Sequence, residues 1–167
     1  MGGSIWLLLV IFLALAVLVL FKLAGRKSYP RFYKPKGDFL LSPGEKRFFD
    51  ALIQSISEDM YICPKVRVAD VIVASVPNTD PDFWRYYNAI NQKHVDFVVV
   101  RRKDFHPLCI VELDGGSHKD PARRERDNIV DAAFEGAGIP ILHIPVASFY
   151  EYKELRQQIT EAAAKRM

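Results

Sequence analysis

Three acidic residues, Asp96, Glu112 and Asp114, stand inside two otherwise apolar stretches of this 167-residue chain. Carboxylates that gather on one surface repel one another. Such a group is stabilised by a bound divalent cation or by protonation of one member. The residue types therefore predict either a cation site or carboxyl groups that share a proton.

The two stretches that carry these acids are typical of β-strands. Residues 94–100 and 108–114 are apolar and partly β-branched, and a polar turn at residues 101–107 separates them. In a hairpin centred near Asp104, residues whose numbers sum to about 208 face each other, so Asp96 lies opposite Glu112. Directly opposite side chains have Cβ atoms ~5 Å apart. Because strands alternate faces, Glu112 and Asp114 point the same way.

A fourth acid, Glu45, opens the first helix that the sequence predicts after residue 40. Ser42-Pro43-Gly44-Glu45 has the spacing of a capping box, and apolar residues continue at helical spacing to about Ser57. Two interpretations of Glu45 stay open. It either caps this helix or reaches toward the carboxylate cluster.

The remaining elements complete an α/β order. We expect a strand over residues 66–76 with Arg67 and Asp70 as a strand pair, and a short aromatic helix or turn from Asp80. A helix opened by Asp120-Pro121 and ended by Gly136-Ala137-Gly138 follows, then a strand at 139–145 and a helix at 148–164. The strand–helix–strand step requires a crossover, which makes that pairing parallel. The prediction is a mixed four-stranded sheet flanked by helices.

The N-terminal segment has a different character. Residues 5–21 are 17 apolar residues without a charge, and residues 4–24 approach the ~20 residues that span a bilayer as a helix. A cleaved signal peptide is the alternative, but no Lys or Arg precedes the run. We expect a transmembrane anchor at 1–24, a basic juxtamembrane linker at 25–40 and a domain at 41–167.

Charge orients this anchor. Six of the 23 Lys and Arg residues lie in residues 1–36, which contain no acid. The positive-inside rule then places the domain in the cytoplasm, on the inner (cytoplasmic) membrane. The other 17 basic residues face 20 acids, so the domain has a net charge of about −3. The basic net charge of the chain therefore comes from the membrane junction, and the domain lacks the strongly basic charge that favours non-specific phosphate binding. The two cysteines, Cys63 and Cys109, lack the spacing of a zinc site.

The motifs together resemble the PD-(D/E)XK (restriction-endonuclease-like) nuclease superfamily. The order helix-β-β-β-helix-β, with an Asp that opens the second strand and Glu-x-acid at the end of the third, matches that superfamily. The stretch 110–118 followed by Arg126-Asp127 and Gly138-Ile139-Pro140 is similar to the branch of the very-short-patch repair endonucleases. Within that branch, an uncharacterised bacterial group that opens its domain with a motif like 41–45 is the nearest. The resemblance covers about residues 40–147.

The resemblance implies roles for individual residues. Asp96 and Glu112 would hold Mg²⁺ or Mn²⁺, Glu45 matches an acid that some members place on the first helix, and His118 would take a proton from water. These are reasonable donors, since Mg²⁺ is usually held by one or two carboxylates and an imidazole accepts protons near neutral pH.

The chain departs from the superfamily at one position. The lysine expected two residues after the Glu is Asp114 here. Asp114 could hold a second metal ion or orient His118, and Lys119, Arg124 or Arg126 could supply the missing positive charge. Arg123, Arg124 and Arg126 are candidate nucleic-acid contacts, or alternatively a solvated helix face.

The function that the resemblance implies is a membrane-anchored, divalent-metal-dependent nuclease that acts on DNA, with RNA as the second candidate. A catalytically degenerate module that binds nucleic acid or a protein partner at the membrane is the alternative. A secreted or periplasmic domain is the third possibility if the first 25 residues are removed.

Overall fold

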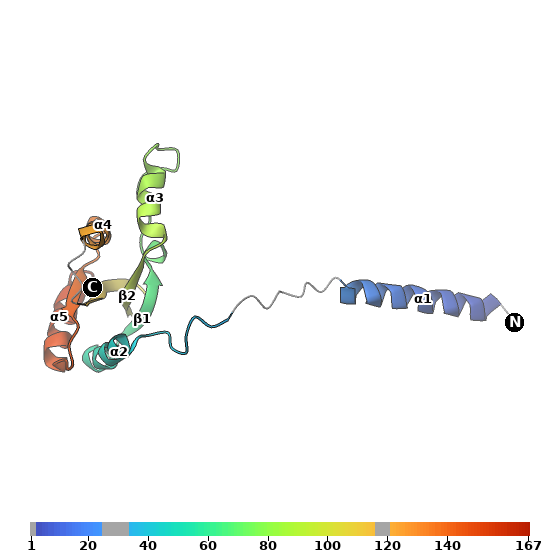
Figure 1. Ribbon diagram of the computed structural model, residues 1–167, viewed down its shortest axis with the longest axis horizontal. Coiled ribbons are helices and arrows are strands. Elements are labelled where there is room, and N and C mark those ends of the chain that lie inside the picture. The colour runs from blue at the N-terminus through green and yellow to red at the C-terminus, as the bar shows by residue number, and fades with distance from the viewer. Residues whose placement is uncertain (1–2, 25–33, 116–120) are drawn as a thin grey trace. The chain divides into compact units, whose positions relative to one another are not determined.

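The computed structural model describes residues 3–24, 34–115 and 121–167, and describes only the backbone of residues 23, 24 and 121–128. The chain divides into two compact units, Met1–Leu40 and Leu41–Met167 (Figure 1). The second unit contains the sheet and its covering helices.

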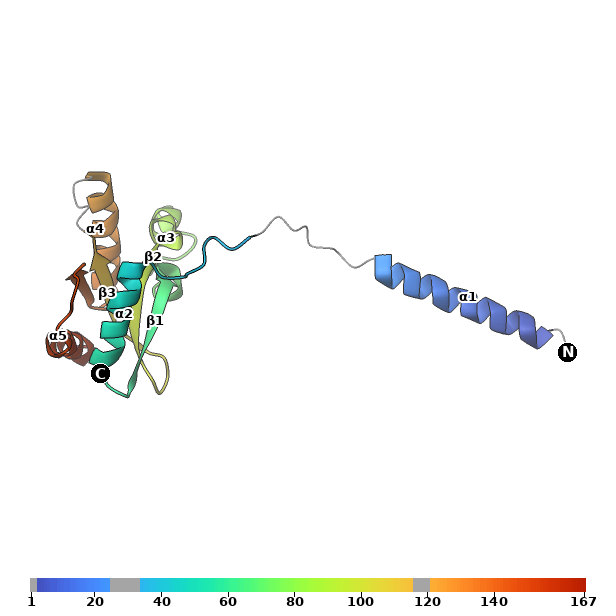
Figure 2. The ribbon, with the colours of Figure 1, turned by 60° about the horizontal axis from the view of Figure 1, so that its bottom comes forward.

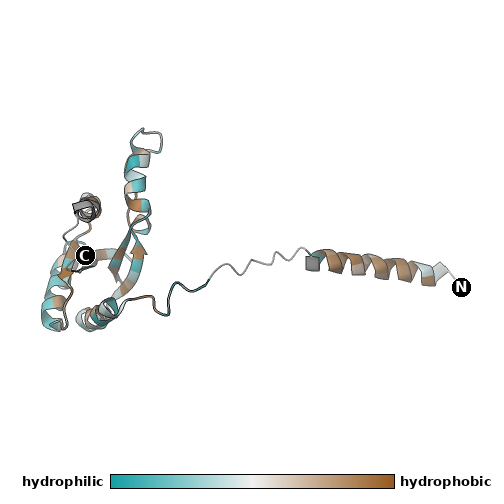
Figure 3. Cartoon of the chain, in the orientation of Figure 1, coloured by the Kyte–Doolittle hydropathy of each residue, from teal (hydrophilic) through white to brown (hydrophobic). Residues whose placement is uncertain are grey.

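The first unit is a single long helix, α1 (Gly3–Ala24). Its 22 residues span about 33 Å at 1.5 Å per residue, close to the ~30 Å of a bilayer core. Its surface is apolar along almost the whole length (Figure 3). By length and composition α1 can therefore cross a membrane, as predicted, although a signal sequence has the same properties.

The second unit is built on a mixed sheet, which confirms the predicted α/β class. Its four strands are β1 (Met60–Arg67), β2 (His94–Arg101), β3 (Pro107–Asp114) and β4 (Ile141–Pro145), in the order β1-β2-β3-β4. The β1–β2 and β2–β3 pairs are antiparallel, and β3–β4 is parallel. Phe97 pairs with Val111 and Val98 with Ile110, which is the register predicted for a hairpin centred near Asp104.

The first strand lies earlier than predicted. We expected residues 66–76, but β1 ends at Arg67 and a 3₁₀ turn follows at Val68–Asp70. The physical reason is the lack of a partner: Arg67 pairs with His94, where β2 begins, so residues beyond Arg67 have no strand beside them. Arg67 and Asp70 are accordingly an exposed ion pair at 3.8 Å rather than a strand pair.

Two pairs of helices cover the two faces of this sheet. On one face, α2 (Pro43–Ser55) and α5 (Tyr152–Ala164) pack side by side (Figure 2). Their residues Phe48, Leu52, Leu155 and Ile159 join the inward side chains of the strands. On the other face lie α3 (Phe83–Asn91) and α4 (Pro121–Gly136), which contribute Ile90 and Phe134 to a second apolar cluster. The sheet is therefore buried on both faces.

The helix ends follow the sequence signals. Ser42 Oγ accepts the Glu45 N–H, and Glu45 Oε2 accepts the Ser42 N–H at 2.7 Å, so the predicted capping box is present. Gly138, just beyond α4, has φ +67°, which glycine adopts without a steric penalty. The last helix begins at Tyr152 rather than 148, because the Tyr150 hydroxyl accepts the Ala147 N–H and holds residues 147–150 in a loop.

Candidate functional site

The strand register sets four polar residues in one row across the sheet, which we call the polar row: Lys65, Asp96, Glu112 and His143, one from each strand. The neighbours of Lys65 on β1 pair with the neighbours of Asp96 on β2, so these two residues lie opposite each other. The β2–β3 register sets Asp96 opposite Glu112 on β3. Glu112 in turn pairs with His143 on β4. Antiparallel and parallel pairing therefore assemble a charged line that no local segment contains.

Lys65 is one of two residues of this row that sequence reasoning missed, and His143 is the other. Its Nζ lies 2.7 Å from Asp96 Oδ1 and also donates to Glu45 Oε1. Burial opposes its charge, but the hydrogen bonds to Asp96 and Glu45 outweigh burial and raise the pKa of Lys65. The backbone of Lys65 has φ +55°, a left-handed conformation that costs energy for a residue with a side chain. Strain of this kind is concentrated at functional sites.

Glu45 performs both roles that the sequence left open. One carboxylate oxygen closes the capping box with the Ser42 N–H, and the other accepts from Lys65. Burial opposes its ionisation, but the hydrogen bonds from Lys65 and Ser42 hold the pKa of Glu45 below its usual value. The N-terminal turn of α2 thus brings an anion to the polar row.

The surroundings of Glu112 oppose its ionisation. Burial, and then the nearby charge of Asp96 and a side-chain hydrogen bond to it, raise the pKa of Glu112 to about 8. A protonated Glu112 donates a hydrogen bond to the Asp96 carboxyl group. Asp96 also accepts the Leu113 N–H at its Oδ2, at 3.1 Å. The raised pKa of Glu112 is consistent with protonation of one member, one of the two arrangements that the residue types predict.

Asp114 has a different partner from the other two acids. Its Oδ1 lies 3.3 Å from His143 Nδ1, and His143 Nε2 lies 3.2 Å from Asp131 Oδ1 on α4. His143 is the β4 member of the polar row, because it is the register partner of Glu112. Asp114 therefore contacts the polar row through His143. The residue at the superfamily's lysine position is therefore within hydrogen-bonding distance of His143. The predicted pairing of Asp114 with His118 involves a residue outside the described part of the chain and stays a prediction.

The remaining predicted residues fall in less fully described parts of the chain. His118 and Lys119 lie outside the described residues. Arg123, Arg124 and Arg126 lie in the first half of α4, of which the backbone is described. Their roles stay predictions.

The donor set of the row fits a hard divalent cation in type. Asp96 and Glu112 offer carboxylate oxygens from adjacent strands, and one or two carboxylates are what Mg²⁺ usually takes from a protein. Within residues 3–24, 34–115 and 121–167, no group of three or more Asp, Glu, His or Cys side chains is arranged to hold an ion. Lys65 forms ion pairs with Glu45 and Asp96 at the same place.

A signal for the two residues that were missed existed in the sequence. Lys65 and His143 are ionisable residues inside short, mostly apolar strands, 60–67 and 141–145, of which the first also ends in Arg67. A polar side chain at such a position must meet partners when the sheet forms, because an unpaired buried charge is costly. Its partners are distant in sequence, 31 residues away for Lys65 and 29 for His143, so spacing did not reveal them.

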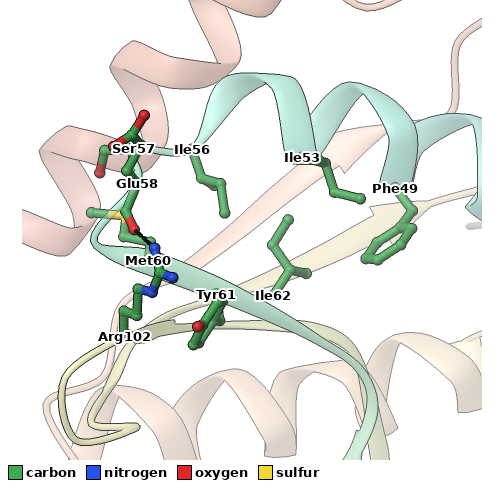
Figure 4. A pocket seen from close by; sticks show the side chains of 9 residues that line it. All are labelled: Phe49, Ile53, Ile56, Ser57, Glu58, Met60, Tyr61, Ile62 and Arg102. Carbon is green, nitrogen blue, oxygen red and sulfur yellow. Dashed lines mark hydrogen bonds between the residues drawn. The ribbon is translucent and has the colours of Figure 1, made fainter.

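A pocket of the domain lies away from this row. A pocket of 680 Å³ opens between α2 and the beginning of β1, and its lining is mostly apolar: Phe49, Ile53, Ile56, Met60 and Ile62 (Figure 4). Arg102 closes one end, with its guanidinium 5.2 Å from the centre of the Tyr61 ring. The pocket contains no carboxylate of the polar row, so it is separate from the candidate site.

Comparison with known proteins gives a family without an activity. A model of the family described as "Protein of unknown function (DUF2726)" matches residues 38–163. No curated protein and no solved structure matches the chain. The matched range contains the polar row, Glu45 and Asp131.

Proposed function

Because this chain belongs to the DUF2726 family of proteins of unknown function, we propose its activity from the polar row: a divalent-metal-dependent nuclease that hydrolyses nucleic-acid phosphodiesters. The domain would act on the cytoplasmic side of the membrane that α1 crosses. The resemblance of the sequence motifs to PD-(D/E)XK nucleases supports the reaction class, and the charge asymmetry around α1 supports the orientation.

The observation that carries the proposal is the carboxyl pair of Asp96 and Glu112. Two acids on adjacent strands share a hydrogen bond in a partly buried position, where Glu112 keeps a proton to neutral pH. Metal binding to carboxylates releases protons, so a pair that shares a proton is also a pair that a cation can bridge. A bound divalent ion would neutralise charge at the phosphorus and lower the pKa of its water.

Lys65 supplies the positive charge that the motif lacks at Asp114. Its ammonium group is held between Glu45 and Asp96, which places a cation beside the same carboxyl pair. When those carboxylates take up a divalent ion, the ammonium group is released to contact a phosphate oxygen. An ammonium group forms such contacts as a flexible point charge with three donors.

The test is cleavage by the full-length chain in detergent micelles. We expect double- or single-stranded DNA to be cut in the presence of Mg²⁺ or Mn²⁺, and Asp96→Asn to abolish cutting. Asp50→Asn is the matched control, because Asp50 is an exposed acid on α2 that pairs only with Lys46 among its described contacts. Equal cutting by Asp96→Asn and the native chain would overturn the assignment of the site.

A second function is favoured by one observation. Lys65 already neutralises Asp96 and Glu45 without a metal ion, an arrangement that suits a non-catalytic module that binds nucleic acid or a protein partner. Calorimetric titration with Mn²⁺ separates the two functions. The nuclease requires saturable binding that Asp96→Asn removes, whereas the binding module requires none.

A further inference from the structure

The contacts of His143 connect three elements of the fold at the edge of the polar row. The imidazole belongs to β4, Asp114 to the end of β3, and Asp131 to the middle of α4. All three side chains are between 31% and 37% exposed, so they are accessible but held. The arrangement ties one covering helix to two strands through a single side chain.

The two ring nitrogens of His143 give the imidazole a contact on each side. Both nitrogens face a carboxylate oxygen, at 3.3 Å for Asp114 and 3.2 Å for Asp131. An ionised carboxylate only accepts hydrogen bonds, so a ring nitrogen that carries a hydrogen donates to it. The imidazole is therefore placed to link a strand and a helix that are distant in the sequence.

We propose that His143 is a positioning residue, which contacts Asp114 and Asp131 through its two ring nitrogens and so forms a bridge that holds α4 against the ends of β3 and β4. The other described contacts of α4 with the sheet are apolar and come from Val130, Ala133 and Phe134. Asp131 adds the polar contact in this part of the helix. The bridge therefore fixes the direction in which the first half of α4 leaves the sheet.

This proposal gives Asp114 a reason to stand where a lysine was expected. Lys65 provides the cation of the row from β1, so the position two residues after Glu112 is free to hold an anion for His143. The bridge itself is independent of the proposed function. Only its effect on nucleic-acid binding rests on that function. The first half of α4 carries Arg123, Arg124 and Arg126 as candidate phosphate contacts, and the bridge would set their position.

Hydrogen exchange of the full-length chain in micelles tests the bridge without any assay of activity. We expect His143→Gln and Asp131→Asn each to reduce amide protection in residues 121–136 by roughly two- to fivefold, the range of partly exposed ion pairs. His143→Arg places a cation with several N–H donors between the same two acids, so amide protection in residues 121–136 should be retained. His94→Gln, at an exposed histidine of β2, is the matched control. Unchanged protection of α4 in both His143→Gln and Asp131→Asn would overturn the proposal.

A binding measurement then separates this proposal from the proposed function. We expect His143→Gln to weaken binding of a DNA oligonucleotide several-fold while the affinity for Mn²⁺ is retained, and His143→Arg to restore DNA binding. If the native chain binds no DNA, the proposed function fails and the exchange data alone decide the bridge. If DNA binds equally well to all variants although α4 loses protection, the bridge holds α4 but does not position phosphate contacts, and that consequence is wrong.

Discussion

Lys65 Nζ lies 2.7 Å from Asp96 Oδ1, and this contact joins a strained residue of an edge strand to the acid at the centre of the polar row. The same ammonium group also neutralises Glu45 at the beginning of α2. A single cation thus connects a helix cap, an edge strand and the carboxyl pair. Its removal should therefore affect stability and the proposed chemistry together.

Lys65→Met should lower the free energy of unfolding and abolish cleavage. The substitution leaves Glu45 and Asp96 without their shared cation in a partly buried position, which should cost about 1–3 kcal/mol. Urea denaturation followed by circular dichroism measures the loss. Lys46→Met, which breaks only an exposed helical ion pair, is the control and should cost less than about 0.5 kcal/mol. Equal stability of the two variants would contradict the bridging role of Lys65.

Glu112→Gln should stabilise the metal-free protein, and more so as the pH rises. Folding raises the pKa of Glu112 to about 8. Below the usual range of a glutamate both states are protonated, so burial of the acid carries no pH-dependent cost. As the pH rises toward 8, the unfolded chain releases this proton and the folded chain retains it, so stability falls. Glutamine has no proton to release and escapes that loss.

The measurement is the melting temperature of both chains in EDTA between pH 5 and 8. The advantage of Glu112→Gln should grow across this window and level off above it, since one pKa unit corresponds to about 1.4 kcal/mol. Glu58→Gln, at an exposed glutamate, should follow the native chain throughout. A constant difference between Glu112→Gln and the native chain would show that Glu112 ionises normally.

Divalent ions should stabilise the native chain through Asp96. A ligand that binds only the folded state raises the melting temperature by an amount that grows with the logarithm of its concentration once this exceeds the Kd. We therefore expect Mn²⁺ to raise the melting temperature of the native chain and of Asp50→Asn, but not that of Asp96→Asn. EDTA should reverse the rise. A shift that persists in Asp96→Asn would place the ion elsewhere.

Arg156→Ala should destabilise the packing of α5 on α2. The Arg156 guanidinium donates to the backbone oxygens of Gln54, at 3.0 Å, and Ser55, at 3.2 Å, where α2 ends and its carbonyl groups lack helical partners. Loss of these two bonds should cost about 1–2 kcal/mol. Chemical denaturation measures the change. Lys153→Ala, at an exposed residue of the same helix, is the control and should be close to neutral.

The orientation of the anchor can be tested with protease in membrane vesicles. Lys34 and Lys36 are exposed in the linker before the domain. With the domain in the cytoplasm, trypsin should release it from inverted vesicles and leave it bound to right-side-out vesicles. Release from right-side-out vesicles would reverse the orientation. A mature chain whose mass lacks the first 25 residues would instead identify a cleaved signal peptide.

The sequence by itself determined the features that depend on local periodicity and on a short hairpin. The apolar length of α1, the capping box at Ser42 and Glu45, and the hairpin register at Phe97 and Val111 all follow from patterns within a few residues or one turn. These patterns were sufficient because the interactions that fix them are local.

Only the tertiary structure decided which charges meet. The first strand forms at 60–67 rather than at the predicted 66–76, because its pairing partner begins at His94. This register brings Lys65 opposite Asp96. Likewise, His143 meets Asp114 only because β4 crosses back to lie parallel to β3. Both partners are about 30 residues apart in the chain. A carboxylate can pair with any cationic or N–H donor group that the fold brings beside it. The partners of Asp96 and Asp114 were therefore set by the register of the strands rather than by spacing in the sequence.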